Sequence, residues 1–267
     1  MIKEIKIETM EDVYEHFMNE GPYDSKIDRY RGVSLYRGMP KAEYKLETSL
    51  FRNCKEKQSE LEESIVRNFL KYTAKIPFNS DENIWRQLAI GQHYGLPTRL
   101  MDWTYSPLIG LHFATSEIDI SGLGKFDAAV WEINVDEFNK TLPNKYQKVL
   151  EDHSAYMFTV DLLSSVVDSL NEYDDDLKQN GIVLIEPPSI DDRIVNQYSY
   201  FSITPHGITN IEEYLTRNTQ LTKKYVIDKE LIWRIRDLLD RLNISERLVY
   251  PGLEGILKWI KRYYYVK

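Results

Sequence analysis

The sequence predicts an α+β fold with a β-rich middle and helices at both ends. Residues 127–135, 181–187 and 193–204 are rich in the β-branched and aromatic residues that favour strands. Residues 229–265 repeat apolar side chains at helical spacing, as do residues 59–76. The chain has 267 residues, of which 42% are apolar and 28% charged. This ordinary composition excludes disordered and collagen-like proteins.

The helices of the first half are predicted from their end signals. Ser59 and Glu62 have the spacing of a capping box, so a helix is expected to open there. Asp81 is the expected N-cap of a second helix, which ends near Tyr94 because Gly95 follows it.

Short elements are expected between and after these helices. Strands are predicted at 34–38 and 98–104, and Ser106-Pro107 has the pattern of an N-cap and first residue of a helix. Residues 155–173 are predicted to be helical, and 135–155 carries no clear pattern.

The domain prediction follows from the absence of a recognisable linker. We expect residues 1–222 to form a mixed core and residues 223–267 to form a helical subdomain packed on it. The C-terminal segment contains 11 Lys and Arg against six Asp and Glu, while the whole chain has a net charge of −8. The rest of the chain is therefore acidic, which does not favour a protein that wraps nucleic acid around a large part of its surface. A local basic groove remains compatible with this charge.

Several features point to a cytoplasmic protein that does not cross a membrane. Cys54 is the one cysteine, which excludes an internal disulfide and any multi-cysteine metal site and fits a reducing compartment. The chain has no apolar run of membrane-spanning length, and residues 1–17 are too polar for a signal peptide. The five histidines have no metal-ligand spacing, so no metal is expected.

The densest group of polar residues lies between positions 92 and 104. Buried polar groups are costly unless paired, so two interpretations remain open. In one, the group is a satisfied network, with Arg99 paired to Asp102 and Trp103 in the core. In the other, it forms a binding site. Its members are Gln92, His93, Tyr94, Arg99, Asp102, Trp103 and Thr104.

Two further segments carry candidate site residues. Tyr36-Arg37-Gly38 ends a predicted strand, where the arginine fork suits a phosphate or carboxylate and the glycine permits close approach of a backbone or ligand. The alternative for Arg37 is an ion pair within the fold. Side chains in residues 193–201 alternate as in a strand, which would place Gln197 on the wall of a groove. The alternative is an ordinary strand edge with polar side chains.

The sequence resembles the FRG domain family, which is named for its (F/Y)-R-G motif and occurs in bacteria and their phages. The resemblance rests on YRG at 36–38, on Trp85 with QHYGLPTRLMDWT at 92–104, and on Pro107, Leu111 and Phe113-Ala114. Residues 193–201 and 248–255 fit the same layout, so the resemblance runs from about residue 30 to 265. The sequence departs from the family at Met101 and at Tyr198-Ser199.

The order of these parts also resembles the ADP-ribosyltransferase fold, which implies an ADP-ribosyltransferase-like β core. In that comparison Arg37 closes the first element. Asp102-Trp103-Thr104 and the helix at 107–116 form the second, and residues 181–197 form the third, with Gln197 near the position of the catalytic Glu. The resemblance implies NAD as substrate and cleavage of its nicotinamide–ribose bond, without a metal.

The resemblance also implies roles for individual residues. Arg37 would bind the pyrophosphate, with Tyr36, Gly38 and Arg99 also contributing to the NAD site. His93 or Thr104 would bind ribose hydroxyls, and Trp103 or Tyr94 would stack on nicotinamide. The reaction passes through an oxocarbenium-like state that a carboxylate stabilises. Gln197 is neutral, so Asp102 is the candidate for that role, with His93 as a further catalytic candidate.

Three classes of function are therefore weighed. The first is an ADP-ribosyltransferase that modifies a protein or nucleic acid, as a toxin or phage-defence effector with an antitoxin-like partner. The second is a non-catalytic module that binds a nucleotide or protein in the same cleft. The third is an effector that acts on nucleic acid through its basic C-terminal segment.

Overall fold

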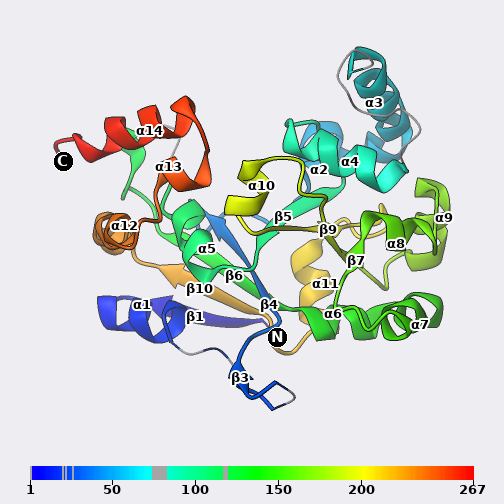
Figure 1. Cartoon of the computed structure of the whole chain (residues 1–267), viewed down its shortest axis with the longest axis horizontal. Coiled ribbons are helices and arrows are strands. Elements are labelled where there is room, and N and C mark those ends of the chain that lie inside the picture. The colour runs from blue at the N-terminus through cyan, green and yellow to red at the C-terminus, as the bar shows by residue number, and fades with distance from the viewer. Residues whose placement is uncertain (1, 20, 22, 26, 74–82, 117–119) are drawn as a thin grey trace.

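An eight-stranded mixed sheet lies at the centre of the computed structural model, which describes residues 2–19, 21, 23–25, 27–73, 83–116 and 120–267 (Figure 1). The outermost pairs at each edge are parallel and the other neighbours are antiparallel. The strands in spatial order are β1 (Lys3–Ile7), β10 (Lys223–Ile227), β6 (Ala128–Asn134), β4 (Ser34–Met39), β5 (Leu100–Thr104), β9 (Ser199–Ile203), β8 (Val183–Glu186) and β7 (Phe158–Thr159). The predicted α+β class is confirmed. A separate hairpin pairs β2 (Tyr23–Asp24) with β3 (Arg29–Tyr30).

The sheet divides in its middle, between β4 and β5. The register of these two strands consists of one pair, Tyr36 opposite Thr104, whereas β4 pairs along its whole length with β6. Likewise, β5 pairs along its whole length with β9. The sheet therefore consists of two halves that are joined at one point and separate beyond it.

Helices cover both halves of the sheet and enclose three apolar clusters. One cluster lies between β5, β8 and β9 and the helices α4, α7, α8 and α9. A second lies between β4, β5 and β6 and the helices α6 and α11, and a third lies between β1, β6 and β10 and the helices α1, α5 and α12. The helices are α1 (Met10–Phe17), α2 (Ser49–Cys54), α3 (Gln58–Thr73), α4 (Ile84–His93), α5 (Pro107–Ala114), α6 (Val135–Thr141), α7 (Asn144–Asp152), α8 (Val160–Ser164), α9 (Leu170–Leu177), α10 (Asp192–Asn196), α11 (Ile211–Asn218), α12 (Ile232–Arg241), α13 (Glu246–Val249) and α14 (Leu253–Tyr263).

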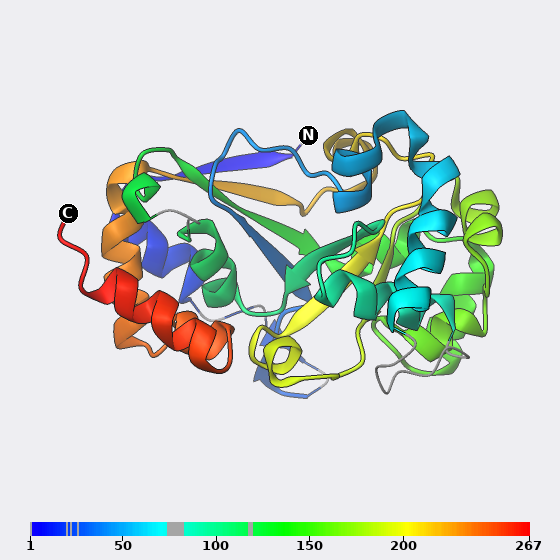
Figure 2. The same ribbon diagram turned by 90° about the horizontal axis from the view of Figure 1, so that it is seen from above.

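Figure 1 shows the C-terminal helices α12, α13 and α14 at one end of the molecule, with α7, α8 and α9 at the other. Figure 2, seen from above, places α10 beside α13. Two side-chain hydrogen bonds join these segments, from Asn196 Nδ2 to the Leu248 carbonyl at 3.0 Å and from Gln197 Nε2 to the Val249 carbonyl at 2.9 Å. The C-terminal helices are thus tied to the half of the sheet that contains β9.

The end signals were the most reliable part of the sequence prediction. Ser106 caps α5 and Pro107 opens it, as expected. Helix α4 ends at His93, and Gly95 follows with a φ of +86°, which confirms its predicted place after the helix. The predicted cap Asp81 lies outside the described residues, and Asn83 accepts the N-cap hydrogen bond of α4.

Two predicted elements were wrong because capping residues interrupt them. Residues 155–173 do not form one helix, since Thr159 starts α8 and Ser169 starts α9. Residues 193–197 are not a strand. Residues 193–196 belong to the short helix α10, which Asp191 caps through the Ile194 amide, and Gln197 is the C-cap of that helix.

The segment 223–267 is not helical throughout. Its first five residues form β10, an inner strand between β1 and β6, followed by α12, α13 and α14. Helix α14 begins at Leu253, two residues after Pro251. Whether the helices beyond β10 form a separate subdomain stays a prediction.

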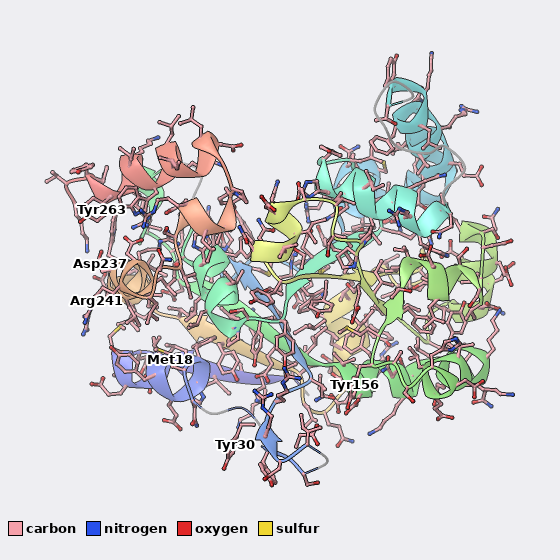
Figure 3. The ribbon with its side chains drawn as sticks, viewed as in Figure 1. Met18, Tyr30, Tyr156, Asp237, Arg241 and Tyr263 are labelled. Carbon is pink, nitrogen blue, oxygen red and sulfur yellow. The ribbon has the colours of Figure 1, made fainter. Side chains whose placement is uncertain are left out.

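Tyrosines account for much of the exposed aromatic surface. Figure 3 labels Tyr30, Tyr156 and Tyr263 at three separate places, and more than half of each residue is exposed. The described part of the chain contains no helix that is long and apolar enough to cross a bilayer.

Candidate functional site

A cleft of about 420 Å³ opens where the two halves of the sheet separate. Ten of the eleven residues that the sequence proposed for the site line it, and Arg99 is the exception. The cleft lining consists of Tyr36, Arg37, Gly38, Gln92, His93, Tyr94, Gly95, Asp102, Trp103, Thr104, Phe113, Arg193, Gln197 and Ser199. Segments far apart in the sequence therefore converge at the division of the sheet.

Arg37 lies in the fork between β4 and β5. Its Nη1 donates a hydrogen bond to the Asp102 carbonyl at 2.6 Å and lies 3.7 Å from Asp102 Oδ2. Its buried Nε has no hydrogen-bond partner among the described residues. Burial lowers the pKa of Arg37, and the Asp102 carboxylate partly offsets this effect. An arginine side chain nevertheless stays protonated in proteins, so the fork holds a cation with an unused donor.

Asp102 presents its carboxylate to the open side of the cleft. The side chain is 57% exposed, and Oδ2 accepts a hydrogen bond from Gln92 Nε2 at 2.8 Å. Gln92 is itself oriented, because its Oε1 accepts from the Thr98 hydroxyl at 2.6 Å. This chain of hydrogen bonds fixes the amide so that it donates to the carboxylate.

His93 and Tyr94 form the wall at the end of α4. His93 Nε2 lies 2.6 Å from Asp191 Oδ2, and Asp191 also caps α10, so one carboxylate joins the two helices. Tyr94 is 67% exposed, and its ring meets the His93 ring edge-on at 5.1 Å between centroids. Tyr94 is therefore free to contact a ligand ring at the rim.

Thr104 and Gln197 are largely committed to structure. The Thr104 hydroxyl donates to the Gln197 carbonyl at 2.7 Å and accepts from the Ser106 amide at 3.1 Å. The side-chain amide of Gln197 donates to the Val249 carbonyl. The remaining polar atom of the Gln197 side chain, Oε1, can only accept hydrogen bonds.

The predicted pairing of Arg99 with Asp102 was wrong. Arg99 is 1% exposed, and its guanidinium bonds Glu62 and, at 2.9 Å, Asp174 Oδ1. Glu62 is thus part of a buried ion pair rather than of a capping box, and Ser59 lies inside α3. Glu62 belongs to α3 and Asp174 to α9. The Arg99 side chain therefore points towards these two helices and does not line the cleft.

Trp103 also belongs to the core. Its indole N–H donates to the Ser202 hydroxyl at 3.0 Å, and its ring is buried in the apolar cluster beneath α6 and α11. Neighbouring residues of a strand point to opposite faces, so Trp103 points away from the face that presents Asp102. The structure thus agrees with the core interpretation of Trp103, which leaves Tyr94 as the exposed ring at the cleft.

Gly38 allows helix α5 to approach strand β4. A Cβ at position 38 would lie 2.1 Å from the Gly110 carbonyl oxygen and 2.3 Å from the Ala114 amide nitrogen. Tyr36 packs against the same helix, where it contacts Gly110. Backbone approach, one of the two options for this glycine, is the one observed.

Sequence reasoning missed Gly95, Phe113, Arg193 and Ser199 as cleft residues. Arg193 was assigned to a strand, and its place in the first turn of α10 follows from the cap at Asp191, which is visible in the sequence. Glu186 is not among the residues that line the cleft, and burial raises its pKa.

The comparison with protein families assigns the part of the chain that carries most of this site. Residues 33–121 match the family model of the FRG domain. These residues are similar to the FRG domain, and the match covers less than half of the chain. The matched region holds β4, α4, β5 and α5, so the FRG motif supplies one wall and the fork of the cleft, while Arg193 and Gln197 lie beyond it. The search of curated proteins found no match, and the search of solved structures found none either.

Proposed function

We propose that the FRG domain binds NAD in the cleft and transfers its ADP-ribosyl group to a protein or nucleic-acid acceptor. The observation that carries this proposal is the position of Arg37 and Asp102 at the division of the sheet. They offer a cation with an unused donor and an exposed carboxylate within one cavity, together with His93 and Gln197.

The chemistry assigns a different task to each side chain. Arg37 would bind the pyrophosphate, since an arginine fork suits phosphate oxygens. Asp102 would stabilise the cationic ribose as the C1′–N bond breaks and nicotinamide leaves with the bonding electron pair. An acceptor nucleophile then bonds to C1′ and releases its proton. His93, held by Asp191, and Gln197 Oε1 would face the ribose hydroxyls, and Tyr94 would cover the nicotinamide ring.

The biological setting belongs to the same proposal. Transfer of ADP-ribose to a cellular macromolecule would inactivate it, which fits a toxin or phage-defence effector with an antitoxin-like partner. The reaction needs no metal, and no group of metal-binding side chains occurs in the described parts of the chain.

Binding and transfer can be measured separately. We expect Arg37→Ala to weaken NAD and ADP-ribose binding by at least about tenfold in calorimetry, because a charge-assisted contact to phosphate is lost. We expect Asp102→Asn to retain binding and to lose nicotinamide release and label transfer from NAD to lysate. Matched controls are Arg217→Ala and Asp175→Asn, since both residues lie outside the cleft lining.

The outcomes separate the three classes of function. Absence of NAD and ADP-ribose binding by the native chain would refute the proposal. Binding without any turnover would identify a non-catalytic module, a result that the neutral Gln197 favours. Binding of RNA or DNA with a steep salt dependence, in place of NAD, would instead favour the nucleic-acid effector.

A further inference from the structure

A second cavity, of about 390 Å³, lies beside the cleft. It is enclosed by α5 on one side and by α13 and α14 on the other. Gly38 and Phe113 line both cavities, so the two spaces lie next to each other at these residues.

The C-terminal wall of this cavity is cationic. Lys258 and Lys261, one helical turn apart on α14, line it together with Tyr250. Lys258 Nζ lies 4.4 Å from the centre of the Tyr250 ring and pairs with Glu254, an exposed contact that competes weakly with a ligand. Lysines bind phosphate as point charges, and the flat rings of Tyr250 and Phe113 are suited to contact a base.

The other charged residues of this wall already have partners. Arg262 bonds Asp240 and Glu246, and Glu246 also accepts from Arg236 at 2.6 Å. These buried bonds join α12, α13 and α14 into one unit. The bond from Gln197 to the Val249 carbonyl then ties that unit to the cleft. Hydrogen bonds thus fix the position of the second cavity's C-terminal wall relative to the cleft.

We infer that the second cavity binds the second nucleotide half of a dinucleotide, with Lys258 and Lys261 facing its phosphate. The inference rests on the proposed function, in which Arg37 faces the phosphate on the cleft side. Cations on both sides of Gly38 and Phe113 suit a pyrophosphate that crosses between the cavities. The protein would therefore prefer a dinucleotide to either mononucleotide.

The experiment compares NAD with nicotinamide mononucleotide and AMP by calorimetry. For Lys258→Gln with Lys261→Gln, we expect NAD and AMP to bind about tenfold more weakly, while nicotinamide mononucleotide binds as before. The double Lys→Arg variant should keep native NAD affinity, because the charges remain. The matched control is Lys145→Gln with Lys148→Gln, two lysines with the same spacing on α7.

Each result decides between the two proposals. Unchanged NAD affinity in the Lys258→Gln, Lys261→Gln variant would overturn the second site. If Arg37→Ala still weakened NAD binding in that case, the proposed function would stand without it. If the native chain bound neither NAD nor a mononucleotide, the proposed function would fail, and this inference with it.

Discussion

At the scale of single residues, Glu246 of α13 joins three helices through its ion pairs. It lies between Arg236 of α12 and Arg262 of α14. Burial alone would raise the pKa of Glu246, but the two arginines outweigh that effect and lower the pKa to about 2. A carboxylate whose pKa falls on folding stabilises the native state above its unfolded pKa. That stabilisation is lost as the pH falls from about 4.5 to about 2.

We therefore expect the free energy of unfolding of the native chain to fall more steeply with acid than that of Glu246→Gln. The difference between the two proteins should shrink by about 3 kcal/mol between pH 6 and pH 2, from the size of the pKa shift. Urea unfolding at a series of pH values measures it. Glu213→Gln, which removes an exposed partner of Arg217, should show little of this dependence. A constant difference across the pH range would contradict the prediction.

Single residues also show where sequence reasoning about the site stops. Arg37, Asp102 and Arg99 were all polar residues near glycines and turns, and nothing in their local pattern distinguishes a cleft residue from a buried one. Arg99 differs because Glu62 and Asp174, which are distant in sequence, lie beside it after folding. Ion pairs between distant segments depend on the tertiary fold, so the sequence predicts the cluster and not which members face the ligand.

At the scale of elements, the packing of α5 on β4 shapes the cleft floor. Gly38→Ala would place a Cβ against the backbone of α5, where no side chain can move aside to relieve the contact. We expect a loss of about 1–3 kcal/mol or more in the free energy of unfolding. Nucleotide binding should weaken with it, because Arg37 is the preceding residue. Urea unfolding and calorimetry measure the two effects.

Gly122→Ala is the matched control for this substitution, since a Cβ there meets nothing within 4 Å. It should leave both stability and binding nearly unchanged. Native stability in Gly38→Ala would show that α5 can shift away from β4 at little cost, contrary to the close approach described above.

Elements with strong end signals were predicted well, and short elements were not. Helix α5, with its Ser-Pro start, and strand β6, with its apolar run, were predicted to within about two residues. The short helix α10 was mistaken for a strand because five residues are too few to reveal a helical period. Its Asp191 cap was the better signal, since capping depends on local hydrogen bonds.

At the scale of the whole molecule, the sheet joins the two ends of the chain. Strand β1 pairs in parallel with β10, which lies more than 200 residues later, and β10 pairs in turn with β6. No local pattern in the sequence encodes this pairing, so the sequence predicted a helical segment from residue 223 and missed its opening strand. In contrast, Arg37, Gln92 and Asp102, which belong to the segments that carry the FRG resemblance, line one cleft.

The same pairing predicts how the chain responds to truncation. A chain of residues 1–222 lacks β10, so β1 and β6 would each expose a strand edge, and the apolar cluster beneath α1 and α5 would lose Tyr225 and Ile227. Such edges favour aggregation. We expect this fragment to be insoluble, or to show no cooperative urea transition in circular dichroism.

The matched control, residues 1–263, removes only a short exposed end and should unfold like the native chain. If residues 1–222 instead unfolded cooperatively with native stability, the segment 223–267 would be a separable subdomain. The β10 strand would then add little to the core. The outcome expected from the sheet is the opposite, because an inner strand contributes hydrogen bonds to two neighbours and side chains to the core.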